Sequence, residues 1–249
     1  MYILLSPHLD DAVFSLGGLI HDWARRGVRV EIWTVCAGDP PAGPLSPFAR
    51  SLHDRWGLGR EAVALRRAED LRACQLLGAA ARHLDVPDCI YRRHPITGEA
   101  MYAGEQAIFG ALAEVEAREL SGALARQVGQ EAPAGTRVFS PLGLGNHVDH
   151  QLVRRAAEKL RGRVSWYPDL PYVLTAEADI PPRVPAGWEP SVHPVSEAGQ
   201  EAWVRASLAY ASQISTFWSG EVELRETLRE YLARAGGLRL WRAHGARDL

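Results

Sequence analysis

Two short clusters of histidine and aspartate are the parts of this chain whose residue types and spacing can do chemistry. They are residues 7–11, PHLDD, and residues 146–150, NHVDH. Zinc accepts imidazole nitrogen and carboxylate oxygen, and a catalytic zinc site needs three protein ligands and an open position for water. One histidine and one aspartate from the first cluster with one histidine from the second supply that count. A spare aspartate and a spare histidine then remain for proton transfer and oxyanion stabilisation.

A third carboxylate, Asp149, lies two residues from His147. We expect it to orient that imidazole by accepting its second N–H. The complete set matches the needs of a hydrolase of amides or esters. A simpler interpretation stands beside this one, because Asp10 or Asp11 can serve only as a helix N-cap. Either cluster alone favours the simpler interpretation, whereas the two clusters together favour a catalytic site.

Strand and helix patterns alternate along the chain and place both clusters after strands. This alternation predicts βαβ units in one domain, residues 1–249, with an α/β, Rossmann-like three-layer sandwich whose mostly parallel sheet is flanked by helices. Ligands bind beyond the carboxyl ends of strands in such sheets, so the clusters are expected to meet in one crevice. Strands are expected at 2–6, 28–36, 83–86, 137–140, 164–167 and 238–241, and helices at 11–26, 60–77, 105–130, 150–160, 197–212 and 221–235.

The remaining long segments, 38–58, 87–103 and 168–195, are rich in proline or glycine and are expected to be loops that select the substrate. Gly17 and Gly18 fall inside the first helix, where each costs roughly 1 kcal/mol relative to alanine. We expect close packing of that helix on the sheet to explain them.

The composition excludes several classes of protein. The chain has 249 residues, 47% of them hydrophobic, and a formal net charge of −2. It is too apolar for a disordered chain, lacks the apolar run of a membrane span, and carries no basic excess for nucleic acid or an anionic membrane. The N-terminus does not have the pattern of a signal peptide, and an odd number of widely spaced cysteines indicates a reducing, cytoplasmic location. The oligomeric state stays undetermined.

The two clusters, together with Gly17-Gly18, resemble the LmbE-like (PIG-L) zinc-dependent N-deacetylases over most of the chain. That family has a His-Pro-Asp-Asp motif near its N-terminus and a later His-x-Asp-His motif. The resemblance implies that the metal ligands are His8, Asp11 and His150, that the general base is Asp10, and that the oxyanion is stabilised, or the leaving group protonated, by His147.

Known members of the family remove acetyl from N-acetylglucosamine units on a small carrier. The resemblance therefore implies a small-molecule N-acetylated amino sugar as substrate and Zn²⁺ as cofactor, although Fe²⁺ accepts the same ligands. Two rival functions stay open, namely a metal-dependent amidase or esterase for a non-sugar substrate and a module that binds metal or sugar without turnover.

This sequence departs from the family pattern in two places. Leu9 replaces the usual proline, and Gly145 stands where some members carry a tyrosine. A phenol that takes part in the reaction must then come from elsewhere, and Tyr167 and Tyr172 are the candidates.

Other polar residues have weaker signals. Arg66, Arg67, Glu69 and Asp70 are expected to form solvated pairs on a helix face, although the resemblance implies that Arg67 contacts substrate. Two loop residues have two interpretations each. Asp88 is expected to bind a sugar hydroxyl or to cap a turn, and Trp56 is expected to stack on a sugar ring or to be buried. The six other histidines are expected to be surface or core residues: His21, His53, His83, His94, His193 and His244.

Overall fold

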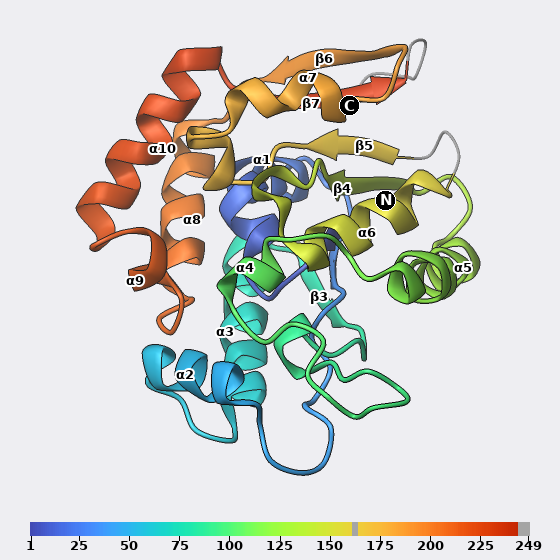
Figure 1. Cartoon of the computed structure of the whole chain (residues 1–249). Helices are drawn as coiled ribbons and strands as arrows, with labels where there is room; N and C mark the ends of the chain where they lie inside the picture. The colour runs from blue at the N-terminus through green and yellow to red at the C-terminus, as the bar shows by residue number, and fades with distance from the viewer. Residues whose placement is uncertain (161–163, 244–249) are drawn as a thin grey trace.

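A seven-stranded, mostly parallel sheet forms the centre of the fold in the computed structural model, which describes residues 1–160 and 164–243 (Figure 1). The strand order is β3-β2-β1-β4-β5-β7-β6, and β7 runs antiparallel to both neighbours. This arrangement confirms the predicted α/β sandwich. One of the six other histidines, His244, lies outside the described residues. The strands are β1 (Tyr2–Ser6), β2 (Val30–Thr34), β3 (Ala80–His83), β4 (Arg137–Pro141), β5 (Val164–Tyr167), β6 (Trp188–His193) and β7 (Leu238–Ala243).

Helices cover both faces of the sheet. One layer is built around α1, α3 and α8, which pack on one another, and the other contains the packed pair α5 and α6 (Figure 1). The longer helices are α1 (Asp11–Arg25), α2 (Pro47–Trp56), α3 (Ala62–Leu77), α5 (Ser121–Glu131), α6 (Val148–Glu158), α8 (Glu197–Leu208) and α10 (Glu221–Ala235), and the one-turn helices are α4 (Glu105–Ile108), α7 (Ile180–Arg183) and α9 (Ile214–Phe217).

The strand order reverses between β1 and β4, which lie side by side at the centre of the sheet. From β1 the chain proceeds to β2 and β3 on one side, whereas from β4 it proceeds to β5 on the other. The two central strands are parallel, so their carboxyl ends meet at one edge. Such a reversal point is where open α/β sheets bind ligands. Both histidine–aspartate clusters follow these two strands.

The segment expected to be a loop at 38–58 contains the helix α2. Its boundaries follow ordinary capping rules: the Ser46 hydroxyl accepts the N–H of Ala49 at 3.0 Å, Pro47 occupies the first turn, and Gly57 ends the helix with φ +65°. The surrounding prolines and glycines concealed this pattern in the sequence.

The single long helix expected at 105–130 is wrong, because non-helical residues separate α4 from the π-helix η2 (Glu116–Leu120) and α5. Tertiary hydrogen bonds replace helical ones in this gap. Asn146 Nδ2 donates to the carbonyls of Phe109 and Gly110, both at 3.0 Å, and the Gln151 side chain bonds Leu112 N and Gly110 O. The break therefore ties this segment to the second cluster.

Two strands also differ from expectation. The third strand lies at β3, three residues before the expected 83–86, and the expected loop at 168–195 contains β6. Pro190 lies within β6, which is the edge strand of the sheet and so tolerates a missing N–H.

Gly17 and Gly18 permit close packing, but against another helix and its leading loop rather than against the sheet. A Cβ at Gly17 would lie 2.3 Å from the ring of Trp203 on α8, and a Cβ at Gly18 would lie 2.4 Å from Val195. These approaches bring α1 and α8 together behind the first cluster.

The hydrophobic core has two parts. The larger surrounds the sheet, and a smaller cluster, which includes Leu52, Ile90, Tyr102 and Val148, lies under the segments that surround the carboxyl edge. No helix among the described residues is long and apolar enough to cross a membrane.

Candidate active site

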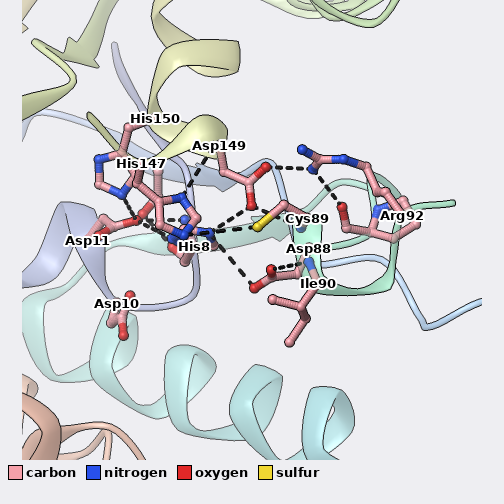
Figure 2. Close-up of polar contacts among 12 residues, drawn as sticks. His8, Asp10, Asp11, Asp88, Cys89, Ile90, Arg92, His147, Asp149 and His150 are labelled. Atoms are coloured by element: carbon pink, nitrogen blue, oxygen red, sulfur yellow. Dashed lines mark hydrogen bonds and ion pairs between the residues drawn. The ribbon is translucent and has the colours of Figure 1, made fainter. Parts of the chain in front are cut away.

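The structure brings His8, Asp11 and His150 together at the carboxyl edge of the sheet (Figure 2). One oxygen of Asp11, Oδ2, lies 3.1 Å from His8 Nδ1 and 3.2 Å from His150 Nε2, and it accepts the backbone N–H of His8 at 2.8 Å. His8 comes from the loop after β1, Asp11 from the start of α1, and His150 from the first turn of α6. Three segments thus deliver one potential metal ligand each.

A carboxylate holds the outer nitrogen of each histidine. His8 Nε2 lies 3.0 Å from Asp149 Oδ2, and His150 Nδ1 lies 2.6 Å from Asp169 Oδ1. When these imidazoles are neutral, as metal ligands must be, donation of these N–H groups leaves His8 Nδ1 and His150 Nε2 as lone-pair nitrogens that face Asp11. Histidines that bind metal are usually oriented by carboxylates in this way.

The two distances from Asp11 suit the ligands of a zinc ion. Ligands of a tetrahedral zinc with bonds near 2.0–2.1 Å lie about 3.3 Å apart, which is close to both measured separations. His150 Nε2 is a buried nitrogen with no hydrogen bond in the described part of the chain. Burial alone would raise the pKa of Asp11, but His150 and His8 hold it well below its ordinary value. The carboxylate is therefore ionised, as a ligand must be.

Asp10 lies beside this group but is not a helix cap. It occupies the N-cap position of α1, yet its side chain caps no helix N–H. The Arg66 guanidinium lies 3.6 Å away. Burial and the neighbouring Asp11 carboxylate raise the pKa of Asp10 to about 7, although Arg66 and His8 oppose the shift. A carboxylate with that pKa is well matched to proton transfer near neutral pH.

His147 is a neutral imidazole with its proton on Nε2. Its Nδ1 accepts the backbone N–H of Asp149 at 3.2 Å, which leaves Nε2 as the donor. Burial and the neighbouring His8 lower the pKa of His147 to about 3. One ring nitrogen from each of His8, His147 and His150 lies within 4.8 Å of the others, and His147 Nε2 lies 4.0 Å from the sulfur of Cys89.

The Asp149 carboxylate orients His8 rather than His147, contrary to our expectation. Asp149 Oδ2 lies against His8 Nε2 and also accepts the backbone N–H of Cys89 at 3.0 Å. Its other oxygen accepts from Arg92 (Figure 2). His147 instead meets the backbone of Asp149, because as the N-cap of α6 it turns its ring back onto the first turn.

Of the two candidate tyrosines, Tyr172 lies in the site. A Cβ at Gly145 would lie 2.4 Å from the Tyr172 ring, so the glycine makes room for it. The ring centroid is 5.6 Å from that of His150. Tyr167 is fully buried and donates its hydroxyl to Leu5 O at 2.8 Å, which is a structural contact.

A cavity of about 170 Å³ opens above these residues. Its walls include the half-buried Trp56 and Phe217 and the exposed Phe109, and Arg55 pairs with Glu105 within it. Asp88 caps a turn, because its Oδ1 accepts the backbone N–H of Ile90 at 3.2 Å, and the residue also lines the cavity. Side chains from α2, α4 and α9 thus enclose one small volume.

The prediction that these polar residues of α3 form solvated pairs on the helix face is partly wrong. Arg66 and Asp70 are buried, Arg66 against Trp56 and Asp10, and Asp70 against the hydroxyl of Tyr210. Arg67 pairs with the exposed Asp39 and does not line the cavity. Glu69 bonds both the N–H and the hydroxyl of Ser212, at 2.9 and 2.6 Å, which anchors the turn before α9.

Sequence reasoning missed Asp169 and Arg66 as site residues. Asp169 follows the end of β5, so the rule that located both clusters, a polar residue beyond a strand end, also applies to it.

Among the described remaining histidines, His53 bonds Tyr91 at 2.6 Å and His83 bonds Asp70 at 2.8 Å, both away from the cluster.

Comparison with known proteins agrees with this fold. Residues 3–160 match the PIG-L family, GlcNAc-PI de-N-acetylase. The chain is 30% identical to a 2'-N-acetylparomamine deacetylase of Streptomyces fradiae, over 96% of this chain and 80% of that protein. A protein of the same description from Niallia circulans is 27% identical, over 69% of this chain and 67% of that protein. Among solved structures, the zinc-inhibited form of the teicoplanin deacetylase Orf2 superposes with a TM-score of 0.82 at 28% identity, over 98% and 99% of the two chains.

The fold, the strand-end cluster and these similarities define a hydrolase of the deacetylase class. The chain belongs to the PIG-L family.

Proposed function

We propose that this protein is a zinc-dependent deacetylase that removes an acetyl group from an N-acetylglucosamine-type amino sugar on a small-molecule carrier. The observation that carries the proposal is the position of Asp11 Oδ2, 3.1 Å and 3.2 Å from one nitrogen each of His8 and His150, with the carboxylate of Asp10 as a possible base next to it. A site that only binds metal has no need of that base.

His8, Asp11 and His150 would hold the metal. Zinc, or Fe²⁺ with the same ligands, supplies a Lewis acid for the amide carbonyl and lowers the pKa of the attacking water. Asp10 would accept the proton of that water as it attacks and would return it to the amide nitrogen as the C–N bond breaks, which releases the amine and acetic acid.

The oxygen of the tetrahedral intermediate needs hydrogen-bond donors placed in advance. We expect His147 to donate its Nε2–H to this oxygen, and the imidazole stays neutral at physiological pH because its pKa of about 3 is far below that range. Tyr172 brings a phenol to the same cavity, in the space that Gly145 leaves. Donors of this kind stabilise an oxyanion by about 3–4 kcal/mol each.

The small size of the cavity supports a substrate that inserts only one part into the site. Pockets for drug-sized ligands measure about 300–1,000 Å³, whereas this cavity measures about 170 Å³. We therefore expect at most the acylated sugar ring to enter, with the carrier outside. The aromatic side chains of Trp56, Phe109 and Phe217 offer apolar faces on which a ring can stack.

Acetate release from a substrate panel tests the proposal. We would compare 2'-N-acetylparomamine, N-acetylglucosamine and an N-acetylated glycopeptide with acylated amines and simple esters, before and after removal of metal. The proposal requires zinc-dependent release from at least one amino sugar. Preference for an amine or ester would favour a non-sugar amidase or esterase, and binding without release would favour a module without turnover.

A further inference from the structure

A chain of buried charges extends from His8 away from the cavity, through Asp149 to Arg92 (Figure 2). Beyond Arg92 it continues to Glu116. All but His8 are at most 7% exposed. Glu116 belongs to the π-helix η2, and Arg92 follows the short helix η1 (Cys89–Tyr91). The proposed function assigns no part to either residue.

Glu116 fixes the plane of the Arg92 guanidinium. Its two oxygens take separate donors, Oε1 from Arg92 Nε at 2.7 Å and Oε2 from Nη2 at 3.2 Å. Such a two-point contact sets the orientation of an arginine as well as its distance. The hydroxyl of Tyr102 donates to Oε2 at 2.5 Å and accepts the backbone N–H of Ala113 at 3.0 Å, so Glu116 is itself held in place.

With that plane fixed, Arg92 directs Nη1 at Asp149. Nη1 donates to Asp149 Oδ1 at 2.5 Å and to the carbonyl of Pro87 at 3.1 Å. The second Asp149 oxygen is then left for the N–H of Cys89 and for His8 Nε2, both at 3.0 Å. Both oxygens of this fully buried carboxylate therefore have assigned partners, and its rotation is fixed.

The fixed Asp149 carboxylate selects one tautomer of His8. In the neutral ring that metal binding requires, Oδ2 accepts the proton on Nε2, so Nδ1 keeps its lone pair and faces the metal position beside Asp11. Buried ion pairs of this kind contribute little net stability, since desolvation offsets their attraction. Because these ion pairs lie behind a possible metal ligand, we expect them to orient that ligand rather than to stabilise the fold.

We propose that Arg92 and Glu116 are positioning residues of the metal centre, which act through Asp149 to orient His8 for metal binding. The inference rests on the proposed function only in requiring that the site binds a metal. It connects the segment between β3 and α5, which we expected to contribute only a loop and a helix, with metal affinity.

Zinc affinity, measured by chelator competition on the full-length protein, tests this inference. Glu116→Gln is isosteric but turns an amide N–H toward the guanidinium or the Tyr102 hydroxyl, so Arg92 must shift. We expect about a 3–10-fold loss of zinc affinity for Glu116→Gln and about 10–100-fold for Arg92→Met. Glu131→Gln, which removes the carboxylate partner of Arg82 on the surface, is the matched control and should bind zinc normally.

Two further measurements separate positioning from general destabilisation. Arg92→Lys keeps the positive charge but loses the planar guanidinium that makes two hydrogen bonds at once. It should therefore recover part of the zinc affinity lost in Arg92→Met. In zinc-loaded protein, the downfield proton resonance of His8 Nε2–H should move upfield in Glu116→Gln. If Glu116→Gln fails to fold, Tyr102→Phe provides the milder perturbation, with a smaller loss of the same sign.

Wild-type zinc affinity in both Glu116→Gln and Arg92→Met would overturn the inference and leave the proposed function intact. A wild-type protein that binds no zinc would overturn both.

Discussion

Asp169 accepts a hydrogen bond from Nδ1 of His150 at 2.6 Å, while its second oxygen accepts the backbone N–H of Leu144 at 3.0 Å. One carboxylate beyond β5 thus fixes both the ring of a possible metal ligand and the turn that precedes it. The two contacts tie the ends of β4 and β5 together around the site, which gives Asp169 a testable function.

Asp169→Asn is expected to weaken zinc binding by about 10–100-fold, because the amide keeps an acceptor but loses the charge that makes His150 a better ligand. Chelator competition measures the change. Asp179→Asn, at an exposed position, is the control and should bind as the wild type does. Equal affinity in the two variants would remove Asp169 from the metal centre.

Asp10→Asn should keep zinc and lose turnover by roughly 10²–10⁴-fold, since the amide cannot accept a proton from water. Elemental analysis and steady-state acetate release measure the two properties separately. An Asp10→Asn enzyme with full activity would refute the general base, and one that has lost its zinc would indicate a ligand instead.

His150→Ala should lower the metal content of the purified protein, because it removes one of three proposed ligands. Elemental analysis of the protein as isolated is the measurement. His21→Ala, a histidine of α1 in neither cluster, should keep its metal. An unchanged zinc content in His150→Ala would exclude this histidine as a ligand.

Gly145→Ala should impair the site through Tyr172. The backbone at Gly145 has φ +76° and the new Cβ would meet the tyrosine ring. Gly135→Ala is a matched control, because Gly135 has the same φ and open space around it, so it bears only the backbone cost of roughly 1–2 kcal/mol. Activity and thermal unfolding should fall further in Gly145→Ala. Equal losses in the two variants would show that Tyr172 does not need this space.

The stability of zinc-stripped protein should fall as the pH rises from 6.5 to 9. Burial alone would lower the pKa of His150, but Asp11 and Asp169 outweigh it and raise the pKa to about 9. A folded-state pKa above the ordinary value of 6.5 contributes stability that is complete below pH 6.5 and is lost as the pH passes through 9. Chemical unfolding should reveal a decrease on the order of 2 kcal/mol.

His150→Gln should flatten that dependence, because glutamine does not titrate. Stability that rises over the same window in the wild-type protein would contradict the assigned charge state of His150.

Much of the fold followed from local patterns. The alternation of short apolar runs with helical spacing predicted the parallel sheet, and strand β1 was predicted residue for residue. Elements whose ends depend on contacts with residues distant in the sequence were harder to predict. The break after α4 exists because Asn146 and Gln151 bond its backbone, and no spacing within 105–130 encodes that contact.

The sequence by itself determined the chemistry available at the site, because residue types and their position after β1 and β4 are local properties. Tertiary structure alone decided the pairing of those side chains. Asp149 is two residues from His147 yet serves His8, 141 positions away, because the cap geometry of α6 turns the His147 ring back onto the helix. Arg92, Asp169 and Tyr172 reach the site from segments without a recognisable motif. Only tertiary packing brings Arg92 to the carboxylate of Asp149, and Asp169 and Tyr172 to the ring of His150.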